Sequence, residues 1–312
     1  MCYPIPAAES AHNQVATTVF LGSSNHPKFT HMLQCFAKGI NATGDIVSVV
    51  CGAYEPCDVA VIFGSCKNKP DTHHVLKRDI IRRAKHFIVC EAPLLGRGPV
   101  KDVLDDQWYR VGVNGFLADS GNFNNRMKPG DRWEKIQQAL GVHMKPWNTR
   151  GRYILVALQI ADDASLRGSD ISQWAYNVVH TVRNHSTRPI IVRTPQYRRT
   201  FNFALLNRLT TEVSDVRFQF GTKDNLIPTL NECWCTVTYS SGLGIDSIVN
   251  GVPSFATDTG SFVYCLGNTD VRYIETPKYA DRVQWVYDLS YAQWNIDEIE
   301  SGEVWRHLRP LF

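Results

Sequence analysis

The chain has 312 residues, a formal net charge of +3, 44% hydrophobic residues and 20% charged residues. This length exceeds one minimal domain, so we expect two domains, and the apolar fraction excludes a globally disordered chain. No apolar run approaches the ~20 residues that cross a bilayer. The start, MCYPIPAAES, lacks the basic and apolar segments of a signal peptide. We therefore expect a soluble, cytoplasmic protein with no membrane partner, a monomer or weak dimer.

Cysteine spacing and charge distribution bear on metal sites and on possible partners. The nine cysteines form no Cys-x-x-Cys pair, so we expect reduced, buried thiols and no metal site. The chain also holds no compelling Asp-x-Asp pair for a metal ion. Residues 1–150 contain 18 Lys and Arg against 13 Asp and Glu, whereas residues 151–312 contain 15 against 17. This modest asymmetry is a hint that the first half faces a polyanion.

The first half alternates apolar runs with amphipathic segments, as parallel strands with crossover helices do. Strands are predicted at 17–22, 45–52, 57–64 and 84–93, and helices at 26–40, 73–85 and 132–141. Residues 110–123 are turn-rich. The polar stretch 145–151 interrupts the pattern, so we place an N-terminal domain at 1–148 and a C-terminal domain at 149–312.

The second half restarts the alternation. Strands are predicted at 153–159, 188–195, 216–221, 234–241 and 252–258, and helices at 170–186, 201–212, 225–233 and 244–251. Asp170 is a plausible N-cap. Residues 281–308 are predicted as two helices, available to pack back on the N-terminal domain. The fold class is therefore α/β, with two Rossmann-like domains that bind ligands in a cleft at the carboxyl ends of their strands.

One stretch carries chemistry: T-Y-S-S-G-L-G-I-D-S-I-V-N-G-V-P, residues 238–253. Ser240, Ser241 and Gly242 follow a strand and precede a helix, whose free N–H groups and positive dipole end bind anions. Asp246, in the first helical turn, could accept hydrogen bonds from the hydroxyls of a sugar. The alternative, an ordinary loop before an ordinary helix, has equal weight on this stretch alone.

The stretch resembles the donor-binding motif of GT-B glycosyltransferases, and capsule-polysaccharide-type enzymes most of all. Y-I-L-V-A-L-Q-I-A-D-D-A-S-L (153–166) and P-I-I-V-R-T-P (189–195) strengthen the likeness. It implies a nucleoside-diphosphate sugar, for which we expect a UDP-sugar, as co-substrate, with no required cofactor. It places Gln159 and Arg193 in the cleft, Ser240, Ser241 and Gly242 on the diphosphate, and Asp246 on the ribose. The chain departs from the family pattern at two places. Arg193 is followed by Thr-Pro, and the acidic residue, Asp246, is Asp rather than Glu.

The whole chain is also similar to glycosyltransferases of tailed bacteriophages that modify phage DNA. The segments that carry this likeness are E-A-P-L-L-G-R (91–97), Y-R-V-G-V-N-G-F-L-A-D-S-G-N-F (109–123) and L-S-Y-A-Q-W-N-I-D-E-I-E-S-G-E-V-W (289–305). It implies transfer of a hexose or pentose to a 5-hydroxymethylpyrimidine, such as hydroxymethylcytosine, in double-stranded DNA. The location would then be the host cytoplasm.

Transfer to a hydroxyl needs a base. The candidates are Glu91, which follows an apolar strand, Asp119, in a glycine-rich loop, and His26, after the first strand. Each is more often structural than catalytic.

The predicted helix 73–85 bears on the acceptor. Arg78, Arg82 and Lys85 fall on the face opposite its apolar side. A basic stripe of this kind can follow a DNA backbone, although a solvated helix face is the commoner meaning.

Three other functions remain open. The same chemistry could act on a bacterial surface polysaccharide. A sugar-nucleotide epimerase shares the two-domain fold but needs paired carboxylates facing one sugar. A non-enzymatic DNA-binding protein would leave the donor motif unexplained, and a nucleotide thermal-shift test would separate it from the enzymes.

Overall fold

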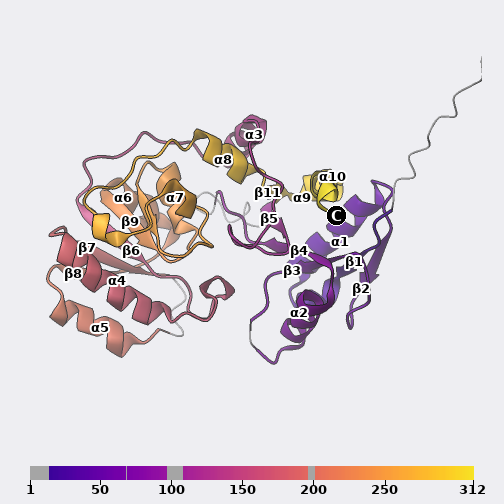
Figure 1. Cartoon of the computed structure of the whole chain (residues 1–312), viewed down its shortest axis with the longest axis horizontal. Helices are drawn as coiled ribbons and strands as arrows, with labels where there is room; N and C mark the ends of the chain where they lie inside the picture. Colours follow the sequence, from indigo (N-terminus) through magenta and orange to yellow (C-terminus); the bar gives the residue numbers. More distant parts are fainter. Residues whose placement is uncertain (1–13, 68, 97–107, 196–200) are drawn as a thin grey trace, which may run out of the picture.

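The structure is a computed structural model that describes residues 14–67, 69–96, 108–195 and 201–312. These residues form two sheets, one of six strands and one of five, with helices around each (Figure 1). No strand pairs across the two sheets within the described ranges. The predicted fold class, two Rossmann-like α/β units that face one another, is confirmed.

The first sheet has the strand order β11-β5-β4-β3-β1-β2. Its strands are β1 (Thr17–Phe20), β2 (Val47–Val50), β3 (Val59–Phe63), β4 (His86–Glu91), β5 (Trp108–Val113) and β11 (Gln293–Asn295). β1 to β4 pair in parallel, whereas β5 and β11 are antiparallel to their neighbours. Its helices are α1 (Pro27–Asn41), α2 (Thr72–Arg83) and α3 (Asp131–Leu140).

The second sheet has the order β10-β9-β6-β7-β8, and all of its pairs are parallel. Its strands are β6 (Tyr153–Ala157), β7 (Ile190–Thr194), β8 (Val216–Phe220), β9 (Cys233–Thr238) and β10 (Ser254–Ala256). Its helices are α4 (Ile171–His185), α5 (Phe203–Glu212), α6 (Lys223–Asn231) and α7 (Leu243–Val249). The predicted cap of α4 is confirmed, because the Asp170 carboxylate accepts from the N–H groups of Ser172 and Gln173.

Three predicted elements differ from the structure. Residues 108–113, partly within the region expected to be turns, form the buried strand β5. Residues 281–308, predicted as two helices, form α8 (Val283–Ser290), the short strand β11, α9 (Ile296–Glu300) and α10 (Glu303–Leu308). Helix α2 ends at Arg83, and Ala84 is already extended. Lys85 is therefore outside the helix that was expected to carry it.

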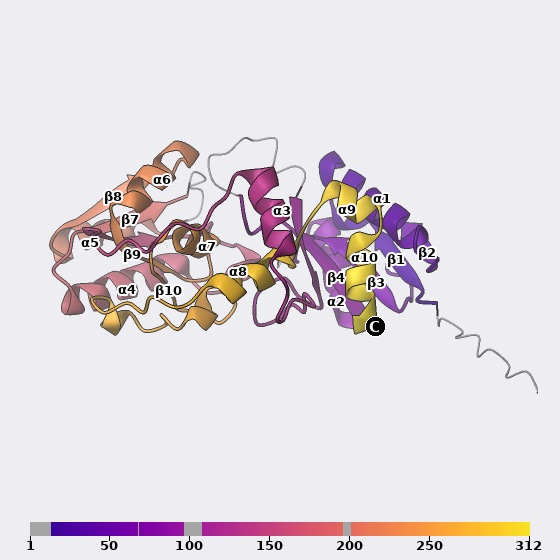
Figure 2. The same cartoon turned by 90° about the horizontal axis from the view of Figure 1, so that it is seen from above.

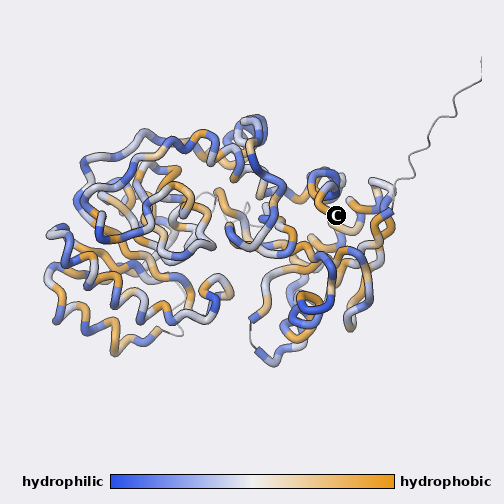
Figure 3. The backbone as a smooth tube through the Cα atoms, viewed as in Figure 1, coloured by the Kyte–Doolittle hydropathy of each residue, from blue (hydrophilic) through white to orange (hydrophobic). Residues whose placement is uncertain are grey.

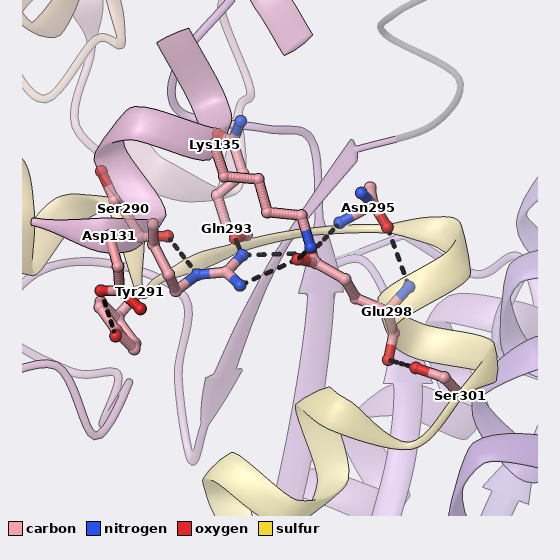
Figure 4. Close-up of polar contacts among 9 residues, drawn as sticks. Asp131, Lys135, Ser290, Tyr291, Gln293, Asn295, Glu298 and Ser301 are labelled. Carbon is pink, nitrogen blue, oxygen red and sulfur yellow. Dashed lines mark hydrogen bonds and ion pairs between the residues drawn. The ribbon is translucent and has the colours of Figure 1, made fainter. Parts of the chain in front are cut away.

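The C-terminal segment returns to the first sheet. β11 pairs with β5, and α9 and α10 lie near α1 (Figure 2). A buried ion pair fixes this return: Arg132 Nη1 of α3 lies 2.9 Å from Glu298 Oε1 of α9. Figure 4 shows Glu298 beside Lys135 and Asn295; Lys135 Nζ lies 2.5 Å from Glu298 Oε1, and the Asn295 N–H donates to the same carboxylate.

A shared apolar cluster joins the two halves. Members from the first half include Leu94, Trp108 and Trp133, and members from the second include Ile248 and Val263. In Figure 3, hydrophobic and hydrophilic residues alternate along the helices of both halves. The two halves are therefore held by common side-chain packing as well as by the chain that connects them. Among the described residues, no helix is both long and apolar enough to cross a membrane.

Candidate active site

A cavity of about 540 Å³ lies where the carboxyl ends of the two sheets meet. One wall, which we call the N-terminal wall, comes from the ends of β1, β3 and β4 and from α2. The other, the C-terminal wall, comes from the ends of β6 and β9 and from the start of α7. Clefts at this edge of open α/β sheets are the usual place for ligands.

A hydrogen-bonded turn forms the C-terminal wall. Gln159, which follows β6, accepts from the Ser240 N–H at 2.7 Å and donates to Ser165 Oγ at 2.7 Å. Ser240 Oγ in turn donates to the Ser165 carbonyl at 3.2 Å. Gln159 is only 8% exposed, so this network fixes the backbone of the turn before any ligand arrives.

The turn leads into α7. Ser241 Oγ accepts from the Leu243 N–H at 3.2 Å, and Ser240, Ser241, Gly242 and Asp246 all line the cavity. The Gly-x-Pro that follows also has a structural reason. Gly251 has φ 79°, and a Cβ there would lie 2.0 Å from the Pro146 carbonyl oxygen. Only glycine fits this close approach, which sets the direction in which the chain leaves α7.

A fixed carboxylate lies on the N-terminal wall. Glu91, the last residue of β4, accepts at Oε1 from the Ser65 N–H at 2.9 Å, and at Oε2 from the Ala92 N–H at 3.3 Å. Ser65 follows Gly64, whose φ of 73° turns the chain toward Glu91. Glu91 lines the cavity, as predicted for a base at a strand end. Its catalytic role stays a prediction.

A buried lysine lies beside Glu91. Lys77 of α2 is 4% exposed and lines the cavity. Within the described residues, its ammonium donates to one acceptor, the Phe63 carbonyl at 3.3 Å. Burial lowers the pKa of Lys77, while the nearby Glu91 carboxylate opposes that shift. A buried cation that faces a cleft and has few partners is a candidate for contact with an anionic ligand.

Two histidines and an arginine complete this wall. His74 Nδ1 accepts from the Lys67 N–H at 3.2 Å, and burial, with help from the Lys77 charge, lowers the pKa of His74 to about 4. His73 and Arg110 also line the cavity. The Arg110 guanidinium lies 5.3 Å from the Phe116 ring and 5.6 Å from the Phe262 ring. The N-terminal wall is thus rich in charged and titratable side chains.

Arg193 is placed differently from the prediction. Its guanidinium points toward β8 and α6, where it donates to Gln219 Oε1 at 2.8 Å, Asn225 Oδ1 at 2.6 Å and the Thr222 carbonyl at 2.7 Å. It does not line the cavity, although Pro195, two residues later, does. These bonds tie Arg193 to β8 and α6. Its contact with the donor stays a prediction.

Asp119 and His26 also lie outside the lining of the cavity. Asp119 pairs with Arg167 and accepts from Thr259 Oγ1 at 2.5 Å, so it links the two halves. Hydrogen bonding to Arg167 lowers the pKa of Asp119. His26 is exposed and caps α1, where its Nδ1 accepts from the Lys28 N–H. Neither position is suited to take a proton inside the cavity, and their roles as bases stay predictions.

The three residues of the predicted basic stripe do not form a free row of cations along α2. Arg78 donates to the carbonyls of residues 67 and 69 at 2.7 and 2.9 Å, and Arg82 pairs with Asp79 at 3.0 Å. Lys85 is exposed beyond the end of α2. Two of the three cations are therefore already held by the protein.

The spacing of Lys77 along α2 indicates that its side chain is buried. Lys77 lies three residues before Ile80 and three after His74, so it shares the inner face of α2 with both. A lysine in an apolar helical pattern is rarely fully buried without a partner. Arg110 and His74 gave no such indication, because their place in the cavity depends on tertiary contacts.

Comparisons with known proteins agree with this architecture. No family model matches the chain, and no curated protein does. Two solved structures from Thermosulfurimonas dismutans are similar in fold. KpsC beta Kdo 2,4 transferase has a TM-score of 0.57 and 14% identity, with 94% of this chain and 99% of that one covered. KpsC beta Kdo 2,7 transferase has a TM-score of 0.52 and 11% identity, with 95% and 100% covered.

A third structure, the lipopolysaccharide glycosyltransferase WaaG, has a TM-score of 0.31, too low to carry an argument. At these identities the likeness concerns the fold. The chain shares the two-sheet architecture of the KpsC transferases over nearly its whole length.

Proposed function

We propose that this protein is a glycosyltransferase that moves a sugar from a nucleotide donor to a hydroxyl acceptor in the cleft between its two sheets. One observation carries the proposal: a single cavity brings the fixed turn at Ser240 to Gly242 opposite the Glu91 carboxylate and the Lys77 ammonium. The similarity in fold to two sugar transferases supports it.

The C-terminal wall would hold the donor. The turn offers backbone N–H groups and serine hydroxyls to a phosphate, and Asp246 offers a carboxylate to the ribose. Among the described residues, the cations that line the cavity are Lys67, Lys77 and Arg110, all from the N-terminal half. The negative charge of the leaving phosphate would therefore be met from across the cleft rather than by Arg193.

Glu91 would act on the acceptor. The acceptor oxygen forms a bond to the anomeric carbon, the bond from that carbon to the phosphate oxygen breaks, and the phosphate leaves with the electron pair. The hydroxyl proton passes to the Glu91 carboxylate, which the Ser65 N–H holds in place. UDP as the nucleotide remains part of the proposal and has no separate support.

For the acceptor, a saccharide hydroxyl is favoured over a hydroxymethylated base in DNA. The two structures similar in fold are named as Kdo transferases, and neither name mentions a nucleic acid. In addition, Arg78 and Arg82 are engaged with the protein rather than presented as a free basic row.

The test has two steps. Thermal shift against a panel of nucleotides and nucleotide sugars should raise the unfolding temperature for at least one nucleotide. Mass spectrometry of oligosaccharides, and of nucleosides from 5-hydroxymethylcytosine DNA, should then show a sugar mass increment on an oligosaccharide, lost in Glu91→Gln. Absence of any nucleotide effect would contradict the proposal, whereas an increment on DNA alone would restore the DNA acceptor.

A further inference from the structure

A second cavity of about 1030 Å³ runs along α2, directly beside the cleft. Ser24, Asn25 and His73 line both cavities. This second cavity, which we call the α2 groove, therefore adjoins the cleft.

The lining of the α2 groove is mixed. Its apolar part consists of Leu76, Val75 and the short turn from Gly52 to Tyr54. Val75 is 48% exposed. Polar groups of Ser24, Asn25 and Thr72 lie along it as well. A sugar ring has apolar C–H faces and a hydroxyl edge, so a lining that alternates apolar patches and hydrogen-bonding groups suits it.

The groove offers little positive charge to a DNA backbone. Its charged lining residues are Arg78, Asp79 and Arg82, and Arg82 pairs with Asp79 at 3.0 Å. Affinity for DNA comes largely from several cations that replace the counterions of phosphates. Because Asp79 offsets one of the two arginines, a single positive charge remains for that exchange.

Size gives the third argument. The cleft, at about 540 Å³, has the volume that holds one small ligand. A bound nucleotide sugar would leave room there only for the reacting end of an acceptor. The rest of the acceptor needs an adjoining surface, and the α2 groove shares the lining residues Ser24, Asn25 and His73 with the cleft.

From these observations we infer that the α2 groove binds the acceptor and that the acceptor is an extended saccharide, whose terminal hydroxyl enters the cleft past His73 toward Glu91. This inference rests on the proposed function, because it assigns the acceptor of that reaction.

Gly52 allows a clean test. A Cβ at this position would have open space around it, and the backbone has no positive φ that would strain a side chain. Gly52→Phe should therefore fill the groove and leave the fold intact. Val49→Phe is the matched control, because Val49 is 49% exposed on β2 and does not line the groove. Val75→Trp blocks the same groove from α2, and circular dichroism would verify the fold of each variant.

The probes are an array of bacterial oligosaccharides, including Kdo oligosaccharides, and a hydroxymethylcytosine duplex. We expect the wild type to bind at least one oligosaccharide, with affinity at least tenfold weaker in Gly52→Phe and Val75→Trp and unchanged in Val49→Phe. Thermal shift with the nucleotide should be the same in all four proteins. Oligosaccharide binding that survives both blocking variants would overturn the inference, as would binding of the duplex alone or of no oligosaccharide. Loss of the nucleotide effect in the wild type would instead defeat the proposed function.

Discussion

The two walls of the cleft are built by different means. The C-terminal wall is a backbone turn whose hydroxyls and amide groups are held by Gln159, and its conformation is settled by hydrogen bonds inside one domain. The N-terminal wall presents side chains with charge, among them Lys77, Glu91 and Arg110. A backbone turn can recognise a group common to many donors, whereas charged side chains provide proton transfer and charge stabilisation. In the proposed function, the C-terminal wall would therefore recognise the donor and the N-terminal wall would supply the chemistry.

The largest effect should come from Glu91. Glu91→Gln keeps the shape of the side chain but cannot take a proton, so we expect the transfer rate to fall about 10²–10⁴-fold with donor binding unchanged. Single-turnover kinetics would measure this. Asp119→Asn is the control, because Asp119 lies outside the cavity, and we expect it to retain most activity. If Asp119→Asn abolished transfer and Glu91→Gln did not, the assignment of chemistry would move to Asp119.

At Lys77 we expect two smaller effects, a gain in stability and a slower transfer. Lys77→Met removes a buried charge, so we expect the free energy of unfolding to rise by roughly 1–2 kcal/mol. Transfer should nevertheless slow about tenfold or more, because a cation is lost near the leaving phosphate. Urea unfolding and steady-state kinetics would give both numbers. Lys67→Met, at a less buried lining residue, is the control, and equal effects in the two variants would argue against a special role for Lys77.

Donor binding by the C-terminal wall can be tested through Gln159. Gln159→Leu removes the acceptor for the Ser240 N–H, and we expect the dissociation constant of the donor to rise about tenfold, or ~1.4 kcal/mol. Calorimetric titration with the nucleotide would measure it. Arg193→Met provides the contrast, because it removes bonds to Gln219 and Asn225. It should lower stability and spare donor affinity, and the opposite result would return Arg193 to the donor site.

The last prediction concerns stability rather than transfer, and it tests the N-terminal wall through pH. The folded-state pKa of His74 is about 4, below its ordinary 6.5, because burial disfavours the charged ring. Between these values the unfolded chain binds more protons than the folded one, so stability falls as pH falls from 6.5 to 4, by roughly 1–3 kcal/mol. His74→Asn should flatten this dependence in thermal unfolding series.

The sequence was most informative where function and structure are local. The turn at Ser240 to Gly242 was predicted because strand, turn and helix are consecutive, so their spacing alone puts them at one sheet edge. Arg193 shows the limit of that reasoning. Its strand was predicted correctly, but the direction of its guanidinium depends on Gln219 and Asn225, which belong to other elements.

Two further failures have the same physical origin. The strand β11 is three residues long, Gln-Trp-Asn, which is too short to show a period of two. It forms because β5, far away in the sequence, offers an open edge. The spacing of Lys77 along α2 indicates that it is buried, but which cavity it lines depends on how α2 packs on the first sheet.

The return of β11 to the first sheet also affects the order of folding during synthesis. Residues 293–295 form the edge strand beside β5, and Glu298 supplies the partner of the buried Arg132. While a ribosome is still making residues before these, β5 has an open edge and Arg132 has no carboxylate from α9. An exposed edge strand is a template for wrong pairing, and domains otherwise fold from the N-terminus as they emerge. Of the two sheets, the first therefore begins to be synthesised earlier and is completed later.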